Sequence, residues 1–193
     1  MRRALAVALP LVALAAGCGG TKTVTVTTTV THVRTVTTTR ASSTTTSTTT
    51  AAASACAAGA LQASFEPIEG SAGAGHISYA LTLTNTSSSP CFVSGVPRAQ
   101  LLGTTGGALP TTIIAEPGPD GKVTLQPNGS ATAEARFSPD VAGQGDQQQG
   151  QCQPTATVLR VTAPGGGTVD APVQPPTSVC ERGSLQFRPF AAS

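Results

Sequence analysis

The sequence predicts an all-β protein, a β-sandwich that occupies residues 56–193 of the chain. In several short runs apolar residues alternate with polar ones, a period of two that is typical of half-buried antiparallel strands. The alternating sets are Leu61, Ala63, Phe65; Ile77, Tyr79, Leu81, Leu83; Ala131, Ala133, Ala135, Phe137; Leu159, Val161; and Leu185, Phe187. No window of helical period approaches about ten residues, which excludes a helical core.

Turn signals separate these runs. Asn-Gly and Asp-Gly pairs favour tight hairpin turns, because both residue types tolerate positive φ. Asn128-Gly129 predicts a hairpin that joins residues 123–126 to residues 130–137, and Asp120-Gly121 is a second turn signal. The glycine-rich stretches 70–75 and 103–107 are interpreted as turns, since they lack the spacing and the lysine of a phosphate-binding loop.

Residues 1–17 have the pattern of a signal peptide. Arg2 and Arg3 precede a 13-residue apolar run, residues 4–16, and small residues follow. A transmembrane helix is the alternative, but spanning a bilayer takes about 20 apolar residues. Pro10 also interrupts the segment. The sequence therefore predicts export across the cytoplasmic membrane.

The segment ends in Leu14-Ala15-Ala16-Gly17-Cys18, which resembles the lipobox of bacterial lipoproteins. In that pattern the cysteine is lipidated and becomes the first residue after cleavage. Ala15 stands where the pattern usually has Leu, and cleavage after Ala15 by an ordinary signal peptidase is the alternative. The sequence has five cysteines, and an odd cysteine in an exported protein needs a role. We expect Cys18 to carry the lipid that anchors the protein to the outer face of the membrane.

The sequence of residues 18–55 indicates a lipidated cysteine followed by a disordered tether. From Thr21 to Thr50, 17 of 30 residues are Thr and three are Ser. Valines alternate with threonines near its start, as in a strand, but no second apolar face is present to be buried. Such a composition does not offset the entropy of ordering. Ser/Thr-rich stalks are also common acceptors of O-linked sugar.

The other four cysteines, Cys56, Cys91, Cys152 and Cys180, can form two disulfides in three ways. Hairpin geometry favours one of them, because opposed residues of an antiparallel hairpin have a constant sum of residue numbers. The midpoint between residue numbers 152 and 180 is Gly166, within a triple-glycine turn. Cys56 and Cys91 are centred near Gly73. We therefore predict Cys56–Cys91 and Cys152–Cys180, which need an oxidising compartment to form.

Several segments resemble a known family. Leu83-Thr84-Asn85-Thr86-Ser87, Pro90-Cys91, Gly95 and Pro97 are similar to the signature of the actinobacterial lipoprotein family called domain of unknown function 4232. Residues 123–127 with Gly129-Ser130, and Cys152 with Pro154, 159–161 and Pro164, resemble its later motifs. Val96 departs from the family, which often has an aromatic residue there. The resemblance implies an immunoglobulin-like sandwich in the cell envelope, and it implies no activity.

Composition and motifs bear on the function class. From Cys56 onward the sequence has six basic and nine acidic residues, a balance that argues against nucleic-acid binding. His76 is the one histidine of this region, and no nucleophile motif, calcium loop or Met/His cluster is present. We therefore expect no catalytic residues, no metal site and no cofactor.

The leading hypothesis is a non-catalytic, membrane-anchored module that binds an envelope protein or glycan. A carrier of a small apolar ligand inside the sandwich is the first alternative, and an envelope hydrolase with carboxylates gathered from separate strands is the second. The long, polar loop Ser138–Gln151 is the first candidate for a binding surface, because loops of this length are either functional or disordered.

Overall fold

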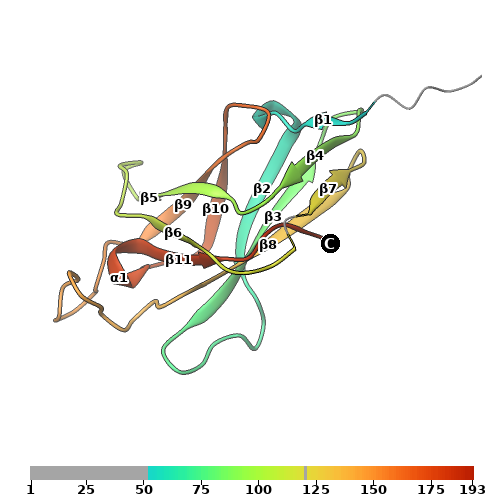
Figure 1. The fold of residues 1–193 in the computed structure, drawn as a ribbon. Helices are drawn as coiled ribbons and strands as arrows, with labels where there is room; N and C mark the ends of the chain where they lie inside the picture. The colour runs from blue at the N-terminus through green and yellow to red at the C-terminus, as the bar shows by residue number, and fades with distance from the viewer. Residues whose placement is uncertain (1–51, 120) are drawn as a thin grey trace, which may run out of the picture. The chain divides into compact units, whose positions relative to one another are not determined.

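The computed structural model describes residues 52–119 and 121–193 (Figure 1). The predicted signal peptide, the predicted lipidation site Cys18 and most of the predicted tether lie outside the described residues, as does Asp120. In the part of the chain that is described, no helix combines the length and the apolar character that crossing a membrane requires.

The described chain is almost entirely β, as predicted. Its strands are β1 (Ser54–Ala55), β2 (Leu61–Pro67), β3 (Ile77–Asn85), β4 (Cys91–Ser94), β5 (Arg98–Gly103), β6 (Thr112–Ala115), β7 (Lys122–Leu125), β8 (Ser130–Phe137), β9 (Ala156–Thr162), β10 (Thr168–Thr177), β11 (Ser184–Phe187) and β12 (Ala191–Ala192). The helical elements are a 3₁₀ turn at Ala58–Ala60 and α1 (Cys180–Gly183). A three-stranded sheet has the order β1-β4-β7. A nine-stranded sheet has the order β5-β9-β10-β2-β3-β8-β11-β6, with β12 paired to β8.

The alternating residues predicted to face inward do so. Phe65, Leu81, Leu83, Ala131 and Leu185 have 0% exposure, and they belong to one continuous core. Residues of the small sheet join the same core from the other side, through Val93 of β4 and Leu125 of β7. The two sheets thus bury a single apolar interior between them, the arrangement of a β-sandwich.

The Asn128-Gly129 turn exists, but the hairpin predicted around it is wrong. Asn128 has a φ of 63°, as the turn requires. The strands on either side, however, belong to different sheets, because β7 pairs with β4 and β8 pairs with β3. The turn is held by Asn85, whose backbone N–H donates to the Gly129 carbonyl and whose carbonyl accepts from the Asn128 N–H. It therefore passes the chain from one sheet to the other.

Both predicted disulfides are confirmed. Cys56 and Cys91 have Cα atoms 4.9 Å apart, and Cys152 and Cys180 have Cα atoms 5.5 Å apart. The predicted geometry behind them differs in one respect, since neither pair lies opposite in a hairpin ladder. Cys56 follows β1, which pairs in parallel with β4 at Cys91. Cys152 and Cys180 lie beyond the β9–β10 ladder, whose register shifts between Pro172 and Thr177.

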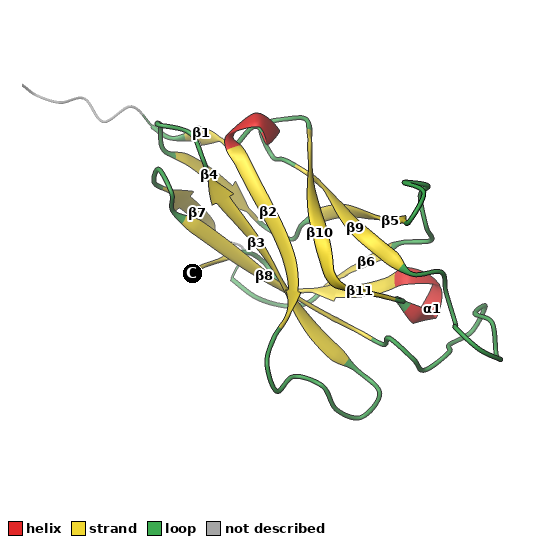
Figure 2. Cartoon of the chain, turned by 180° about the vertical axis from the view of Figure 1, so that it is seen from behind, coloured by secondary structure: helices red, strands yellow, loops and turns green. Residues whose placement is uncertain are grey.

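The domain has two ends that carry different features (Figures 1 and 2). At the N-terminal end lie β1 and the β9–β10 turn, whose Gly165 N–H donates to the Cys56 carbonyl. At the far end lie α1, shown red in Figure 2, and the loop Ser138–Gln151. The Cys56–Cys91 disulfide fastens the N-terminal end, and the Cys152–Cys180 disulfide fastens the far end.

Asn85→Ala is expected to destabilise the domain by about 1–3 kcal/mol, the cost of leaving buried polar groups unpaired. The Asn85 side chain is fully buried. Its amide Nδ2 donates to the carbonyls of Ser89 and Leu125, at 2.8 and 3.1 Å. Urea unfolding measures the change, with the exposed Thr86→Ala as control, for which we expect less than about 0.5 kcal/mol. An Asn85 variant as stable as this control would show that the side chain does not join the strands.

Candidate functional site

The loop Ser138–Gln151, the first candidate from the sequence, is fixed to the far end of the domain by one carboxylate. Asp146 accepts hydrogen bonds from the backbone N–H of Gly143 at 2.9 Å and of Arg182 at 2.8 Å. It also accepts from the Glu181 N–H and, at 2.7 Å, from the side-chain amide of Gln153. The carboxylate therefore joins the loop to α1 and to the segment that follows Cys152.

The receiving surface is a left-handed turn. Glu181, Arg182 and Gly183 have φ values of 53°, 56° and 74°, a conformation that only glycine adopts without strain. The N–H groups of Glu181 and Arg182 both donate to the Asp146 carboxylate, as backbone N–H groups do in turns that bind anions. A β-carbon on Gly183 would collide with the Pro110 carbonyl oxygen. The turn is therefore built with a glycine at the one position where a side chain has no room.

The loop fits closely over this turn. A β-carbon added at Gly143 would come within 2.7 Å of the Glu181 side chain, and one at Gly145 within 2.9 Å of the Arg182 side chain. Gln151 adds a further contact, since its side-chain amide donates to the hydroxyls of Ser178 and Thr155. The loop thus has a defined position against its neighbours.

These hydrogen bonds determine the ionisation of Asp146. Partial burial acts to raise the pKa of this carboxyl, but the bonds from Gln153, Gly143, Arg182 and Glu181 outweigh it and lower the pKa to about 2. Each bond is stronger to the charged form than to the neutral form. Asp146 therefore remains an anion throughout the physiological pH range.

Asp146→Asn is expected to loosen the loop at neutral pH. The four donors that bond to the two carboxylate oxygens of Asp146 would meet a single, uncharged acceptor oxygen in the amide. In the parent protein, whose folded-state pKa is depressed, the carboxylate's contribution is complete above its ordinary pKa near 3.8 and is lost as the pH falls through about 2. The ¹⁵N–¹H shifts of Glu181 and Arg182 report this directly. They should move in Asp146→Asn at pH 7 and stay in place in the matched loop variant Asp140→Asn. Equal shifts in both variants would contradict the role of Asp146.

The same carboxylate lies beside the second disulfide. Ligand atoms of Asp146, Cys152 and Cys180 all fall within 4.8 Å of one another, a separation that would suit a metal ion. The two sulfur atoms are bonded to each other, however, and a disulfide sulfur is not the thiolate that a metal requires. The cluster is explained by its structural role in fastening the loop.

Two grooves lie at opposite ends of the sandwich. The far-end groove, of about 350 Å³, lies between the turn Gly103–Leu109 and residues Gln151, Pro154 and Thr155, and none of its lining side chains is charged. The Arg98 groove, of about 430 Å³, lies at the N-terminal end between residues 94–98, the β9–β10 turn and Phe190. Arg98 is the one charged residue that lines it.

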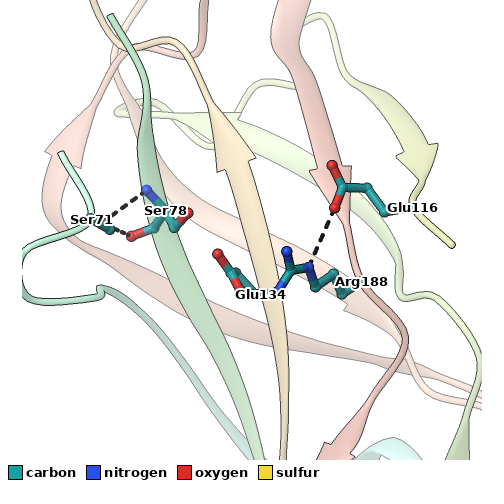
Figure 3. Close-up of polar contacts among 5 residues, drawn as sticks. All are labelled: Ser71, Ser78, Glu116, Glu134 and Arg188. Atoms are coloured by element: carbon teal, nitrogen blue, oxygen red, sulfur yellow. Dashed lines mark hydrogen bonds and ion pairs between the residues drawn. The ribbon is translucent and has the colours of Figure 1, made fainter. Parts of the chain in front are cut away.

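A charged cluster lies on the outer face of the large sheet (Figure 3). Arg188 pairs with Glu116 at 3.4 Å and with Glu134 at 3.2 Å, and the Arg188 side chain is 61% exposed. Pairs as exposed as this contribute about 0–1 kcal/mol. On β9 and β10, Arg160 pairs with Asp170 at 2.7 Å. The hydrogen bond from Arg160 lowers the pKa of Asp170.

The sequence-derived candidates are thus placed as follows. The four cysteines of the domain form the two predicted disulfides. His76 lies in the β2–β3 turn, with its ring Nδ1 3.0 Å from the Ala74 carbonyl oxygen. Asp146 was not among the residues predicted from the sequence, although it anchors the loop Ser138–Gln151. The pattern Gly143-Gln144-Gly145-Asp146 was its signal, because a carboxylate between tight glycine turns commonly bonds to backbone N–H groups.

Comparison with known proteins gives one match. The family described as a domain of unknown function (DUF4232) matches residues 56–191. No curated protein and no solved structure matches the chain. The matched segment includes both disulfides, the two grooves and the loop fixed by Asp146. The chain belongs to the DUF4232 family.

Proposed function

We propose that the protein is a lipoprotein of an actinobacterial cell envelope, anchored by lipid on Cys18 to the outer face of the cytoplasmic membrane. The signal-peptide and lipobox patterns of residues 1–18 support this. The two disulfides account for four of the five cysteines, and Cys18 is the fifth. Disulfides of this kind are typical of exported proteins. A diacylglyceryl group at Cys18 supplies the two chains that stable anchoring takes.

The domain, in this proposal, is a non-catalytic module that binds another envelope component, a protein or a glycan, through its far end. The observation that carries the proposal is the fixed loop Ser138–Gln151, held by Asp146 at the end opposite β1. A surface that is ordered before binding loses less conformational entropy on association. This end also faces away from the point at which the chain enters the domain.

The tether suits such a module. Residues 19–55 would average roughly 33 Å from end to end as a flexible coil and reach on the order of 120 Å when extended. The module could therefore search the cell-wall layer while remaining attached to the membrane.

Two carboxylates of the domain are engaged in fixing its structure. A hydrolase with paired carboxylates needs one acid whose pKa is raised, so that it can donate a proton. The pKa values of Asp146 and Asp170 are both lowered, which suits a structural anion and not a proton donor. Each is engaged by hydrogen-bond donors of its own surroundings.

Site-specific photocrosslinking in intact cells tests the proposal. The probe replaces the exposed Gln148 of the loop, and the matched control replaces the exposed Gln62 of β2, a residue of the same type on the sheet face. We expect a discrete partner to be captured from position 148 and not from position 62. Asp146→Asn in the same chain should reduce that capture. No capture at 148, or equal capture from both positions, would contradict the proposal.

A further inference from the structure

The Arg98 groove at the N-terminal end has a mixed lining, in which apolar side chains stand beside the hydroxyls of Ser94 and Thr162 and a single charge. Val96, Pro97 and Phe190 come from the β4–β5 connection and the C-terminal segment, and Pro164 comes from the β9–β10 turn. Phe190 and Pro97 are themselves largely buried, so they present an edge to the groove rather than a mobile side chain. The volume of about 430 Å³ lies within the range of sites for small ligands.

Backbone hydrogen bonds fix the segments that form the groove. The Phe190 N–H donates to the Gly95 carbonyl at 3.0 Å, and the Ala163 N–H donates to the Gly167 carbonyl at 3.0 Å. Gly165 in turn donates to the Cys56 carbonyl at 2.8 Å, next to the first disulfide. Its shape is therefore formed before any ligand arrives.

Arg98 lies at the lip of this groove, opposite Thr162 in the β5–β9 ladder. Its side chain is exposed, and the ion pairs found within residues 52–119 and 121–193 involve Arg160 and Arg188, not Arg98. A guanidinium offers parallel N–H donors that match a carboxylate in bidentate geometry. Arg98 is therefore placed to receive an anion whose remainder contacts the apolar side chains.

We propose that the Arg98 groove binds a small monocarboxylate with an apolar body. One guanidinium matches one negative charge, whereas a phosphate dianion would need further cations or N–H donors. The surrounding domain is acidic, with nine acidic against six basic residues from Cys56 onward. This net charge repels a dianion about twice as strongly as a monoanion. This site is at the other end from the proposed partner surface and does not depend on it.

Hexanoate is the probe, titrated calorimetrically into the processed full-length protein in nanodiscs of zwitterionic lipid, with empty nanodiscs subtracted. Hexanamide has the same shape and no charge. We expect saturable hexanoate binding that is about tenfold or more tighter than hexanamide binding, since the charge-assisted bond is lost in the amide. Arg98→Gln should weaken hexanoate binding to the same degree, and Arg98→Lys should retain part of it.

Val96→Trp should fill the groove and abolish binding. The matched control, Thr105→Trp, places the same ring in the far-end groove and should leave binding unchanged. Arg98→Gln changes an exposed side chain, so it keeps the test decisive even if Val96→Trp fails to fold. Absence of saturable binding, equal affinity for hexanamide, or full affinity in Arg98→Gln would overturn the proposal. Crosslinking from position 148 should be unaffected by Arg98→Gln and Val96→Trp, which separates the two proposals.

Discussion

Phe65→Ala is expected to lower the free energy of unfolding by about 3–5 kcal/mol, the cost of removing a large buried aromatic side chain. Phe65 has 0% exposure. Its ring centroid lies 5.1 Å from that of Tyr79, 6.4 Å from that of Phe137 and 6.3 Å from that of Phe187. Four strands of the large sheet therefore meet at this one side chain.

The loss is large because the chain has only five Phe, one Tyr and no Trp with which to fill its interior. The aromatic neighbours of Phe65 are held by β3, β8 and β11, so they cannot close the cavity without moving the sheet. Urea unfolding measures the effect. Phe92→Ala is the matched control, because Phe92 lies on the outer face of β4 with Lys122 over its ring at 3.6 Å. Comparable losses in the two variants would show that Phe65 is not the centre of the core.

Replacing both Cys56 and Cys91 by Ala is expected to cost about 3–4 kcal/mol. The disulfide spans 35 residues, and opening a loop of that length restores conformational entropy to the unfolded chain. Domains of this size have about 5–15 kcal/mol of stability in total, so the loss is a large share. The disulfide also fixes β1 to β4, which is a short, two-residue pairing at the edge of the small sheet.

Denaturant unfolding of this double variant and of the unmodified chain under reducing conditions measures the effect. Both should lose stability, and the reduced chain should lose clearly more, because the Cys152–Cys180 disulfide is also opened. A double variant within about 1 kcal/mol of the parent would contradict the entropic contribution assigned to this disulfide.

The strands of the core were predictable from the sequence because burial on one face imposes a period of two. Leu81 and Leu83 point inward and Thr82 and Thr84 point outward for this reason alone. The disulfide pairs were predictable as well, although their residues do not lie opposite in hairpins as supposed. The rule of a constant sum of residue numbers still selected the right pairs, because each pair lies just beyond two strands that do form an antiparallel pair, β2–β3 and β9–β10.

The connections between sheets were not predictable in the same way. Asn128-Gly129 has the residues of a hairpin turn, but the partner of β8 is decided by Asn85, far away in the sequence. The parallel pairing of β6 with β11 is likewise a tertiary contact, since residues 112–115 show little alternation between polar and apolar positions. Local pattern specifies which residues turn, and long-range packing specifies which strands then meet.

In the candidate site, too, the sequence predicts the local feature but not the long-range contact that positions it. Residues 138–151 were recognisable as a long polar loop, but their attachment depends on the left-handed conformation of Glu181 and Arg182, which the sequence does not signal. Gly183 alone suggests such a turn. The Arg98 groove is formed by three segments that are remote in the sequence, so only the fold brings them together.

We propose that lipid on Cys18 holds the module at the membrane. Intact mass spectrometry of the mature protein, extracted from the membrane fraction of the cells that make it, tests the claim most directly. The account predicts a chain that begins at Cys18 with the added mass of at least a diacylglyceryl group, and two disulfides in the remainder. A mature chain with an unmodified thiol at residue 18, found free in the culture fluid, would contradict it.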